Sequence, residues 1–133
     1  MMLKKIVYVS VFVGDQERAL DFYTNVLGLE KRIDSPATDG SRFLTVGVNG
    51  QDFELVLWPG TPGRGASALG SPVAQYTIET DDCRAAFETL KSRGVQFEPS
   101  EIIDQPWGSI ARFRDPDGNM LQLRELRLAT TAA

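Results

Sequence analysis

Residues 110–125 read Ile110-Ala111-Arg112-Phe113-Arg114-Asp115-Pro116-Asp117-Gly118-Asn119-Met120-Leu121-Gln122-Leu123-Arg124-Glu125, two alternating runs separated by turn-forming residues. Asp117-Gly118 tolerates the positive φ of a tight reversal, and Pro116 restricts the backbone just before it. Side chains of a strand alternate between two faces, so Leu121 and Leu123 share one face while Gln122 lies on the other. The stretch therefore predicts a β-hairpin with one apolar face and one face that offers polar groups.

The same pattern occurs earlier in the chain. Residues 41–55 align with residues 109–123 without a gap, and the similarity continues upstream with an offset two positions shorter. The aligned residues include Asn49-Gly50 with Asp117-Gly118, Glu54 with Gln122, and Asp15, Arg18, Ala19 and Gly28 with Asp81, Arg84, Ala85 and Gly94. The sequence thus predicts two copies of one structural unit.

Each copy is predicted to contain a strand, a helix and three further strands. β-branched runs, capping residues and glycine stops give the boundaries. The first copy has a strand over 6–13, a helix over 18–27 after the cap Asp15, a short edge strand over 29–34 and the first hairpin. The second has a strand over 73–80, a helix from Asp81 or Asp82 to Arg93, a short strand over 95–97, a loop over 99–108 and the second hairpin.

Neither copy buries its sheet face alone. The sequence therefore predicts an α+β fold in which two βαβββ modules pair into a curved mixed sheet with the helices outside. With 133 residues and 42% apolar content, residues 1–133 are expected to form a single domain. The segment 59–72, rich in Gly, Pro and Ser, is predicted to connect a first module over about 4–58 to a second over about 73–126, followed by a tail over 127–133.

The composition excludes several classes of function. A net charge of −4 with scattered basic residues argues against a nucleic-acid partner, and it favours a cationic or neutral ligand over a phosphorylated one. The chain shows no signal-type segment or membrane-spanning run, and Cys83 has no second cysteine to pair with, so we expect a cytoplasmic protein with no membrane partner. Histidine is absent, which excludes Ser-His and Cys-His catalytic machinery.

Two motifs add a family resemblance. They are Val13-Gly14-Asp15 followed by Ala19-Leu20-Asp21-Phe22-Tyr23 and Val26-Leu27-Gly28-Leu29, and Phe113-Arg114-Asp115-Pro116-Asp117-Gly118-Asn119. Together with the repeat, they resemble the vicinal oxygen chelate superfamily, which includes glyoxalase I, extradiol dioxygenases, methylmalonyl-CoA epimerase and the fosfomycin and bleomycin resistance proteins. The resemblance implies a homodimer and a pocket inside the curved sheet, made within one chain or across two.

The resemblance also implies where a metal would bind. The metalloenzymes of this superfamily place one ligand on the first strand and one on the last strand of each unit, usually His or Glu and sometimes Gln. The matching positions are Tyr8, Glu54, Gln75 and Gln122, of which only Glu54 is a strong ligand. Divalent transition metals prefer imidazole, thiolate or several carboxylates, so we expect no metal cofactor, with a divalent metal as the alternative.

Strand alternation independently directs these four positions toward the inner face of the sheet. A carboxylate inside the apolar run 53–57 is costly unless it is paired, hydrated or used, so Glu54 is a candidate catalytic base or ligand anchor. The alternative is an internal ion pair of Glu54 with Arg124 or Arg112. The predicted ligand-binding residues are Tyr8, Ser10, Glu54, Trp58, Gln75, Thr77, Trp107 and Gln122.

Each of these assignments has a structural alternative. Gln75 and Gln122 suit amide-lined recognition, or they hydrogen-bond each other. Tyr8 is a hydrogen-bond donor or a packing residue, and the two tryptophans are a stacking wall, although Trp107 also fits a lid or a dimer contact. Cys83 is interpreted as structural, because Asp81 and Asp82 oppose the helix dipole that would activate its thiol.

Two functions are compatible with these residues. The first is a metal-free binding protein, similar to the bleomycin resistance proteins, that holds a small, partly aromatic or polar organic molecule. The second is a lyase or isomerase in which Glu54 abstracts a proton while Tyr8, Gln75 or Gln122 stabilises the oxyanion or completes a metal site. A subunit without a ligand of its own is the third possibility, and the inward polar residues argue against it.

Overall fold

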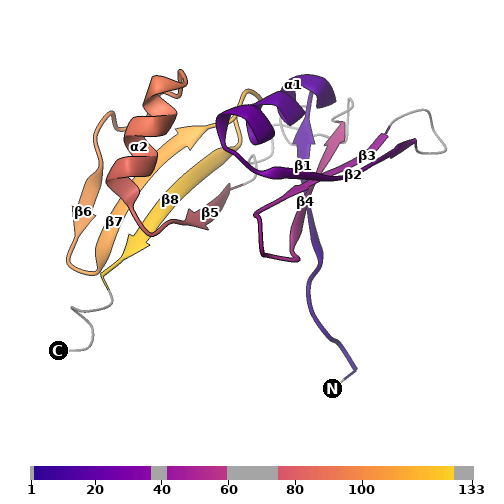
Figure 1. The fold of residues 1–133 in the computed structure, drawn as a ribbon, viewed down its shortest axis with the longest axis horizontal. Coiled ribbons are helices and arrows are strands. Elements are labelled where there is room, and N and C mark those ends of the chain that lie inside the picture. The colour runs from indigo at the N-terminus through magenta and orange to yellow at the C-terminus, as the bar shows by residue number, and fades with distance from the viewer. Residues whose placement is uncertain (1, 37–41, 60–74, 128–133) are drawn as a thin grey trace. The chain divides into compact units, whose positions relative to one another are not determined.

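The computed structural model describes residues 2–36, 42–59 and 75–127. The chain divides into two compact units, Met1–Ala74 and Gln75–Ala133, and each is described by itself (Figure 1). Each unit contains one four-stranded mixed sheet and one main helix. The α+β class and the βαβββ order of each unit are therefore confirmed, whereas the pairing of the two modules into one curved sheet stays a prediction.

The first unit has a mixed sheet in the order β1-β4-β3-β2. β1 and β4 are parallel, and the predicted hairpin is confirmed because β3 and β4 pair antiparallel with Gly47 beside Glu54. The edge strand extends two residues beyond its predicted end. The elements are β1 (Tyr8–Val13), α1 (Gln16–Asp21), the π-helical turn η1 (Phe22–Val26), β2 (Glu30–Pro36), β3 (Arg42–Gly47) and β4 (Glu54–Pro59).

The helix of this unit differs from its prediction at both ends. α1 begins at Gln16 because the extended residue Asp15 accepts a hydrogen bond from the backbone N–H of Arg18 at 3.1 Å. After Asp21 the coil widens, since the N–H of Leu27 donates to the carbonyl of Phe22, five residues back. The apolar core of the unit lies on the other face of the strands from Tyr8 and Ser10, and it contains Val11, Val13, Ala19, Tyr23, Leu44, Val46, Leu55 and Leu57.

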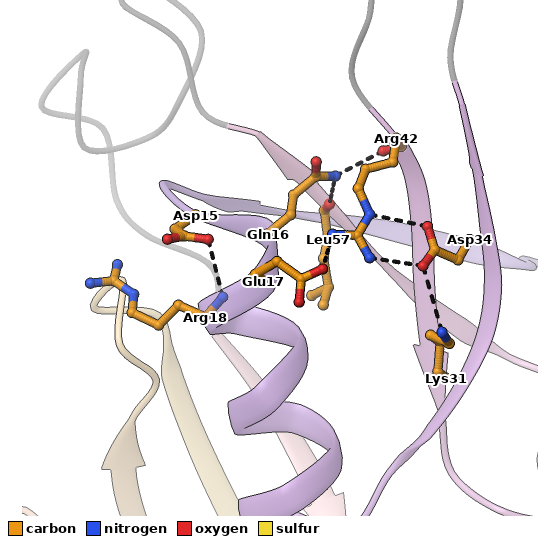
Figure 2. A network of polar contacts seen from close by, with 8 residues as sticks. All are labelled: Asp15, Gln16, Glu17, Arg18, Lys31, Asp34, Arg42 and Leu57. Carbon is orange, nitrogen blue, oxygen red and sulfur yellow. Dashed lines mark hydrogen bonds and ion pairs between the residues drawn. The ribbon is translucent and has the colours of Figure 1, made fainter.

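An arginine-centred cluster ties α1 to the sheet of the first unit (Figure 2). The guanidinium of Arg42 on β3 donates to both oxygens of Asp34 on β2, at 3.0 and 2.8 Å, and it also bonds Glu17 on α1. The Asp34 carboxylate additionally lies 3.6 Å from the ammonium of Lys31. Gln16 donates its amide to the carbonyls of Arg42 and Leu57, so helix and strands are joined at several points.

The second unit repeats this topology with the sheet order β5-β8-β7-β6. β5 and β8 are parallel, and β7 and β8 form the hairpin predicted from residues 110–125. Two acids cap α2: Asp82 accepts from the N–H of Ala85 at 2.9 Å, and Glu125 accepts from that of Cys83 at 2.7 Å. The elements are β5 (Gln75–Glu79), α2 (Cys83–Ser92), β6 (Ile103–Gln105), β7 (Gly108–Arg114) and β8 (Met120–Leu126).

Two predictions for this unit are wrong. Residues 95–97 form no strand, because Phe97 makes a single bridge to Phe113 and packs its ring on Phe87 at 4.4 Å. The second strand of the unit lies instead inside the predicted loop 99–108, where Ile103–Gln105 pairs with β7. The two strands reverse at Pro106-Trp107, and the strand was missed because three residues of mostly polar composition show no alternating apolar pattern.

The turn Asp115-Pro116-Asp117-Gly118 is organised by its first residue. One oxygen of the Asp115 carboxylate accepts from the N–H groups of Asp117 and Asn119, each at 2.9 Å, and the other accepts from the amide of Asn119. Gly118 takes a φ of 90°, as Gly50 does in the equivalent hairpin. Such backbone angles suit glycine, which explains why both turns carry it.

The predicted connector 59–72 lies outside the described residues, apart from Pro59 at the end of β4. The predicted tail is likewise outside them beyond Arg127, whose backbone N–H donates to the carbonyl of Trp107. The helices within the described ranges are all too short or too polar to span a membrane.

Candidate functional site

The sheet of the first unit carries four of the predicted site residues on one face. In the register of β1 and β4, Tyr8 lies beside Glu54 and Phe12 beside Trp58. Ser10 is two residues along β1 from Tyr8, on the same face. The structure thus brings Tyr8, Ser10, Glu54 and Trp58 together on two neighbouring strands.

Three of the aromatic rings on this face lie in a row. The ring of Phe43 on β3 lies 5.7 Å from that of Tyr8 and 6.3 Å from that of Trp58, edge to face in both cases. Such pairs hold rings in defined orientations. Phe43 was not among the predicted site residues, because nothing in the sequence places its ring between those of Tyr8 and Trp58. We refer to Tyr8, Phe43 and Trp58 as the aromatic row.

Glu54 lies in the same face and is mostly buried. Its side chain is 15% exposed, and Oε2 lies 3.6 Å from Nη1 of Arg32. The other oxygen, Oε1, is buried and accepts no hydrogen bond from any residue that the structure describes. Buried carboxylate oxygens are normally satisfied, so an unmatched one is unusual. The cation beside Glu54 is therefore Arg32 of its own unit, a residue that the sequence analysis did not consider.

Gly47 explains how Arg32 reaches Glu54 from the far edge of the sheet. Arg32 is on β2, and β3 lies between that strand and β4. A Cβ added to Gly47 would lie 2.7 Å from Cζ of Arg32, so the guanidinium rests on the bare backbone of β3. Arg32 also donates to the carbonyl of Val48 at 2.7 Å and to Glu30 at 3.1 Å. A glycine inside a strand was the available signal for this close approach.

The second unit contains a hollow of about 460 Å³ on its sheet. Two of the predicted residues lie directly beside each other there, since Thr77 on β5 pairs with Gln122 on β8. Gln75 is two residues earlier on β5, beside Met120. The residues that line the hollow are Gln75, Tyr76, Thr77, Arg112, Met120 and Gln122.

Arg112 sets the hydrogen bonding of this hollow. Its Nε donates to Oε1 of Gln122 at 3.0 Å, so the amide oxygen of Gln122 is taken by Arg112. Next to the hollow, Glu79 accepts from Arg124 at 2.7 Å. The polar groups at this surface are consequently ordered by arginines.

Trp107 lies elsewhere on the second unit. It comes just before β7, which begins at Gly108. The hollow lies toward the other end of this strand, where Arg114 pairs with Met120. Its side chain is 41% exposed, and it is not among the residues that line the hollow. The assignment of Trp107 to a binding site stays a prediction.

The positions that would hold a metal are a poor donor set for one. Among the described residues, no group of three or more His, Cys, Asp or Glu side chains could hold a metal ion. The carboxylate of Glu54 faces the guanidinium of Arg32, and the amide oxygen of Gln122 accepts from Arg112. A divalent cation would therefore have to compete with Arg32 for Oε2 of Glu54 and with Arg112 for the amide oxygen of Gln122.

Cys83 offers no nucleophile. Its side chain is buried, and burial together with the nearby Glu125 carboxylate raises the pKa of the thiol above its ordinary value. A thiol with a raised pKa is a weak nucleophile at neutral pH. The structural interpretation of Cys83 fits this environment.

Comparison with known proteins agrees with this architecture. The model of the Glyoxalase/Bleomycin resistance protein/Dioxygenase superfamily matches residues 5–123. The chain belongs to this superfamily. The resemblance that the two motifs indicated is thereby confirmed for this superfamily member.

Its relatives include both binding proteins and enzymes. TnmS3, an antibiotic binding protein from Streptomyces sp. CB03234, is 34% identical with a TM-score of 0.81, covering 95% of this chain and 98% of TnmS3. The Bacillus subtilis (strain 168) protein YetH is 32% identical over 93% of this chain and all of YetH. The lactoylglutathione lyase GLX1 of Arabidopsis thaliana is 30% identical over 90% of this chain, which spans 44% of that enzyme.

Proposed function

We propose that this superfamily member binds a small, partly aromatic organic molecule without a metal cofactor, as a bleomycin-resistance-like binding protein. The observation that carries the proposal is the aromatic row beside Glu54 on the first sheet. Aromatic walls with a few polar groups are typical of small-molecule sites, because rings supply apolar area at low entropic cost. Oε1 of Glu54 is the acceptor that an N–H or O–H group of the ligand would satisfy.

Two further observations support binding without a metal. The arginines beside Glu54 and Gln122 compete with a cation for these oxygens. The similarity to TnmS3, an antibiotic binding protein, extends over nearly the whole chain. Sequestration of a ligand requires a shaped surface and specific contacts, and it requires no metal or activated nucleophile.

A lyase or isomerase is the second candidate. The observation that favours it is again Oε1 of Glu54, which lacks a donor among the described residues and could accept a proton from a substrate. Tyr8 lies beside Glu54 and would stabilise an oxyanion. We place this candidate second because Nη1 of Arg32 lies 3.6 Å from Oε2 of Glu54 and would compete with a substrate for the carboxylate.

Native mass spectrometry with elemental analysis tests the metal-free part of the proposal. Protein purified without chelators or added metal is expected to be free of stoichiometric transition metal. The same spectra test the proposed homodimer through the mass of the assembly. A stoichiometric metal that is lost in Glu54→Ala would overturn the metal-free proposal and favour the enzyme.

Fluorescence titration tests the aromatic row. Trp107→Phe leaves Trp58 as the remaining tryptophan, so quenching then reports on the first sheet. Bleomycin and neutral naphthalene carboxamide serve as ligands. Phe43→Leu is expected to weaken binding roughly tenfold through the lost ring contacts. Phe22→Leu is the matched control, because Phe22 lies in η1 rather than on the sheet. Equal affinities of the two leucine variants would refute a role of the aromatic row.

A further inference from the structure

The hollow of the second unit has hydrogen-bond donors around it, and no acidic side chain is found among the described residues that line it. We infer that this hollow binds a carboxylate carried by an aromatic molecule and that Arg112 is the residue that selects it. The inference goes beyond the proposed function, since it names a further ligand site and the chemical class of molecule that this site would take. The described residues that line the hollow belong to the second unit, whereas the aromatic row belongs to the first.

The guanidinium of Arg112 is oriented by its neighbour and still has donors to offer. Its Nε is bonded to Oε1 of Gln122 at 3.0 Å, and no ion pair of Arg112 is found in the part of the chain that the structure describes. The two Nη groups of an arginine form a planar fork that matches the two oxygens of a carboxylate. Arg112 therefore has the geometry of a carboxylate receptor with one of its bonds already made.

The other polar groups of the hollow add donors. Because Arg112 takes the oxygen of Gln122, the amide NH₂ of Gln122 is the group left for a ligand. Thr77 lies beside Gln122 and contributes a hydroxyl, and Gln75 contributes a second amide. Such a surface suits a ligand group that accepts several hydrogen bonds.

Two acids beside these strands are engaged by other arginines. Glu79 on β5 pairs with Arg124 at 2.7 Å. Arg114, the next outward residue along β7, pairs with Glu98 at 3.3 Å. Within the described part of the chain, Arg112 is the charged residue that lines the hollow.

Local charge outweighs the charge of the whole chain at such a site. The net charge of −4 favours cationic or neutral ligands when only composition is considered. Exposed charges farther than about 10 Å are largely screened at an ionic strength near 0.1 M, whereas a guanidinium in contact with the ligand is not. The carboxylate preference follows from Arg112, while Met120 supplies apolar surface for the aromatic part.

The volume also fits this class of ligand. Sites for small molecules commonly enclose about 300–1,000 Å³, and the hollow of about 460 Å³ lies within that range. A two-ring aromatic carboxylate is accordingly a suitable probe.

Titration of the ¹⁵N-labelled full chain with naphthalene carboxylate and naphthalene carboxamide tests the inference. The carboxylate is expected to shift amide signals of residues 75–77 and 120–122 and to bind roughly tenfold tighter than the carboxamide. Arg112→Gln should abolish this preference, and Arg112→Lys should retain only part of it because the fork is lost. Arg114→Gln removes the same charge from the same strand outside the hollow, and it should retain the preference.

Several outcomes would overturn the inference. They are equal affinities of the two compounds, a preference that survives in Arg112→Gln, and carboxylate-induced shifts confined to other residues. If any of these results is obtained while the carboxamide still binds at the aromatic row, the carboxylate site is refuted and the proposed function is retained. The opposite case is a carboxylate preference at the hollow together with equal affinities of Phe43→Leu and Phe22→Leu for bleomycin and the carboxamide. That result would refute binding at the aromatic row and retain the carboxylate site.

Discussion

The pair of Arg32 and Glu54 is the feature of the first unit most open to measurement. Replacing Arg32 by methionine keeps most of its length and removes the guanidinium. The change removes the guanidinium that lies 3.6 Å from the carboxylate of Glu54, whose side chain is only 15% exposed. It also removes the donor to the carbonyl of Val48 at 2.7 Å.

The size of the effect follows from the burial of each contact. Exposed ion pairs contribute about 0–1 kcal/mol, and breaking a buried pair costs about 3–5 kcal/mol. The side chains of Arg32 and Glu54 are 18% and 15% exposed, and their charged atoms are 3.6 Å apart, so an intermediate cost of about 1–2 kcal/mol is expected. The lost hydrogen bond to Val48 adds about 1 kcal/mol. Arg32→Met should therefore lower the free energy of unfolding by about 2–3 kcal/mol.

Urea unfolding at pH 7 measures this change through the midpoint at constant slope. The double-mutant cycle with Glu54→Gln isolates the pair, with an expected coupling of about 1 kcal/mol. Gly47→Ala also disrupts the contact between Arg32 and Glu54, because the added Cβ would displace the guanidinium of Arg32. Gly47→Ala should cost less in the Arg32→Met background, where no guanidinium remains to be displaced. A coupling of zero in both cycles would refute the argument that Gly47 lets Arg32 hold Glu54.

Three further predictions concern the fold. The hydrogen bonds from Arg42 hold the pKa of the Asp34 carboxyl below its ordinary value. The ionised carboxylate therefore stabilises the folded protein fully above the unfolded-state pKa of about 4, and this contribution is lost as the pH falls through the lower pKa of the folded state. Asp34→Asn should cost about 1 kcal/mol at pH 7 and progressively less in acid, as measured by urea unfolding across pH, and a constant difference would contradict this. Gly108→Ala places a Cβ 2.0 Å from the carbonyl oxygen of Glu125 and should lower the free energy of unfolding by at least about 3 kcal/mol. Gly118→Ala meets no atom within 4 Å and should lower it by about 1–2 kcal/mol because of the positive φ alone. Similar melting temperatures of the two variants would contradict the close β7–β8 contact at Gly108. Cys83 should react with a thiol reagent such as Ellman's reagent only after unfolding, and rapid labelling of the native protein would contradict its burial.

The inner and outer faces of the strands could be predicted from the sequence. Alternation of side chains is a local property of an extended backbone, so the run around Glu54 is enough to place Glu54 and Trp58 on one face. The turn glycines and the caps are equally local, since Asp15 and Gly118 act within a few residues of their own position. The family followed from the same local motifs and from their repetition.

The partners of those residues were decided only by the tertiary structure. Arg32 meets Glu54 because two strands bring them to a common face and Gly47 leaves room between them. Phe43 meets Tyr8 through a strand order that the sequence does not specify. The predicted hairpin places Arg112 opposite Gln122, but only the structure shows that the two side chains are hydrogen-bonded. The backbone period determines which way a side chain points, but strand order and register determine what it touches. The sequence by itself therefore determined the α+β class, the repeat and the polar face, whereas the tertiary structure decided which charges and rings meet there.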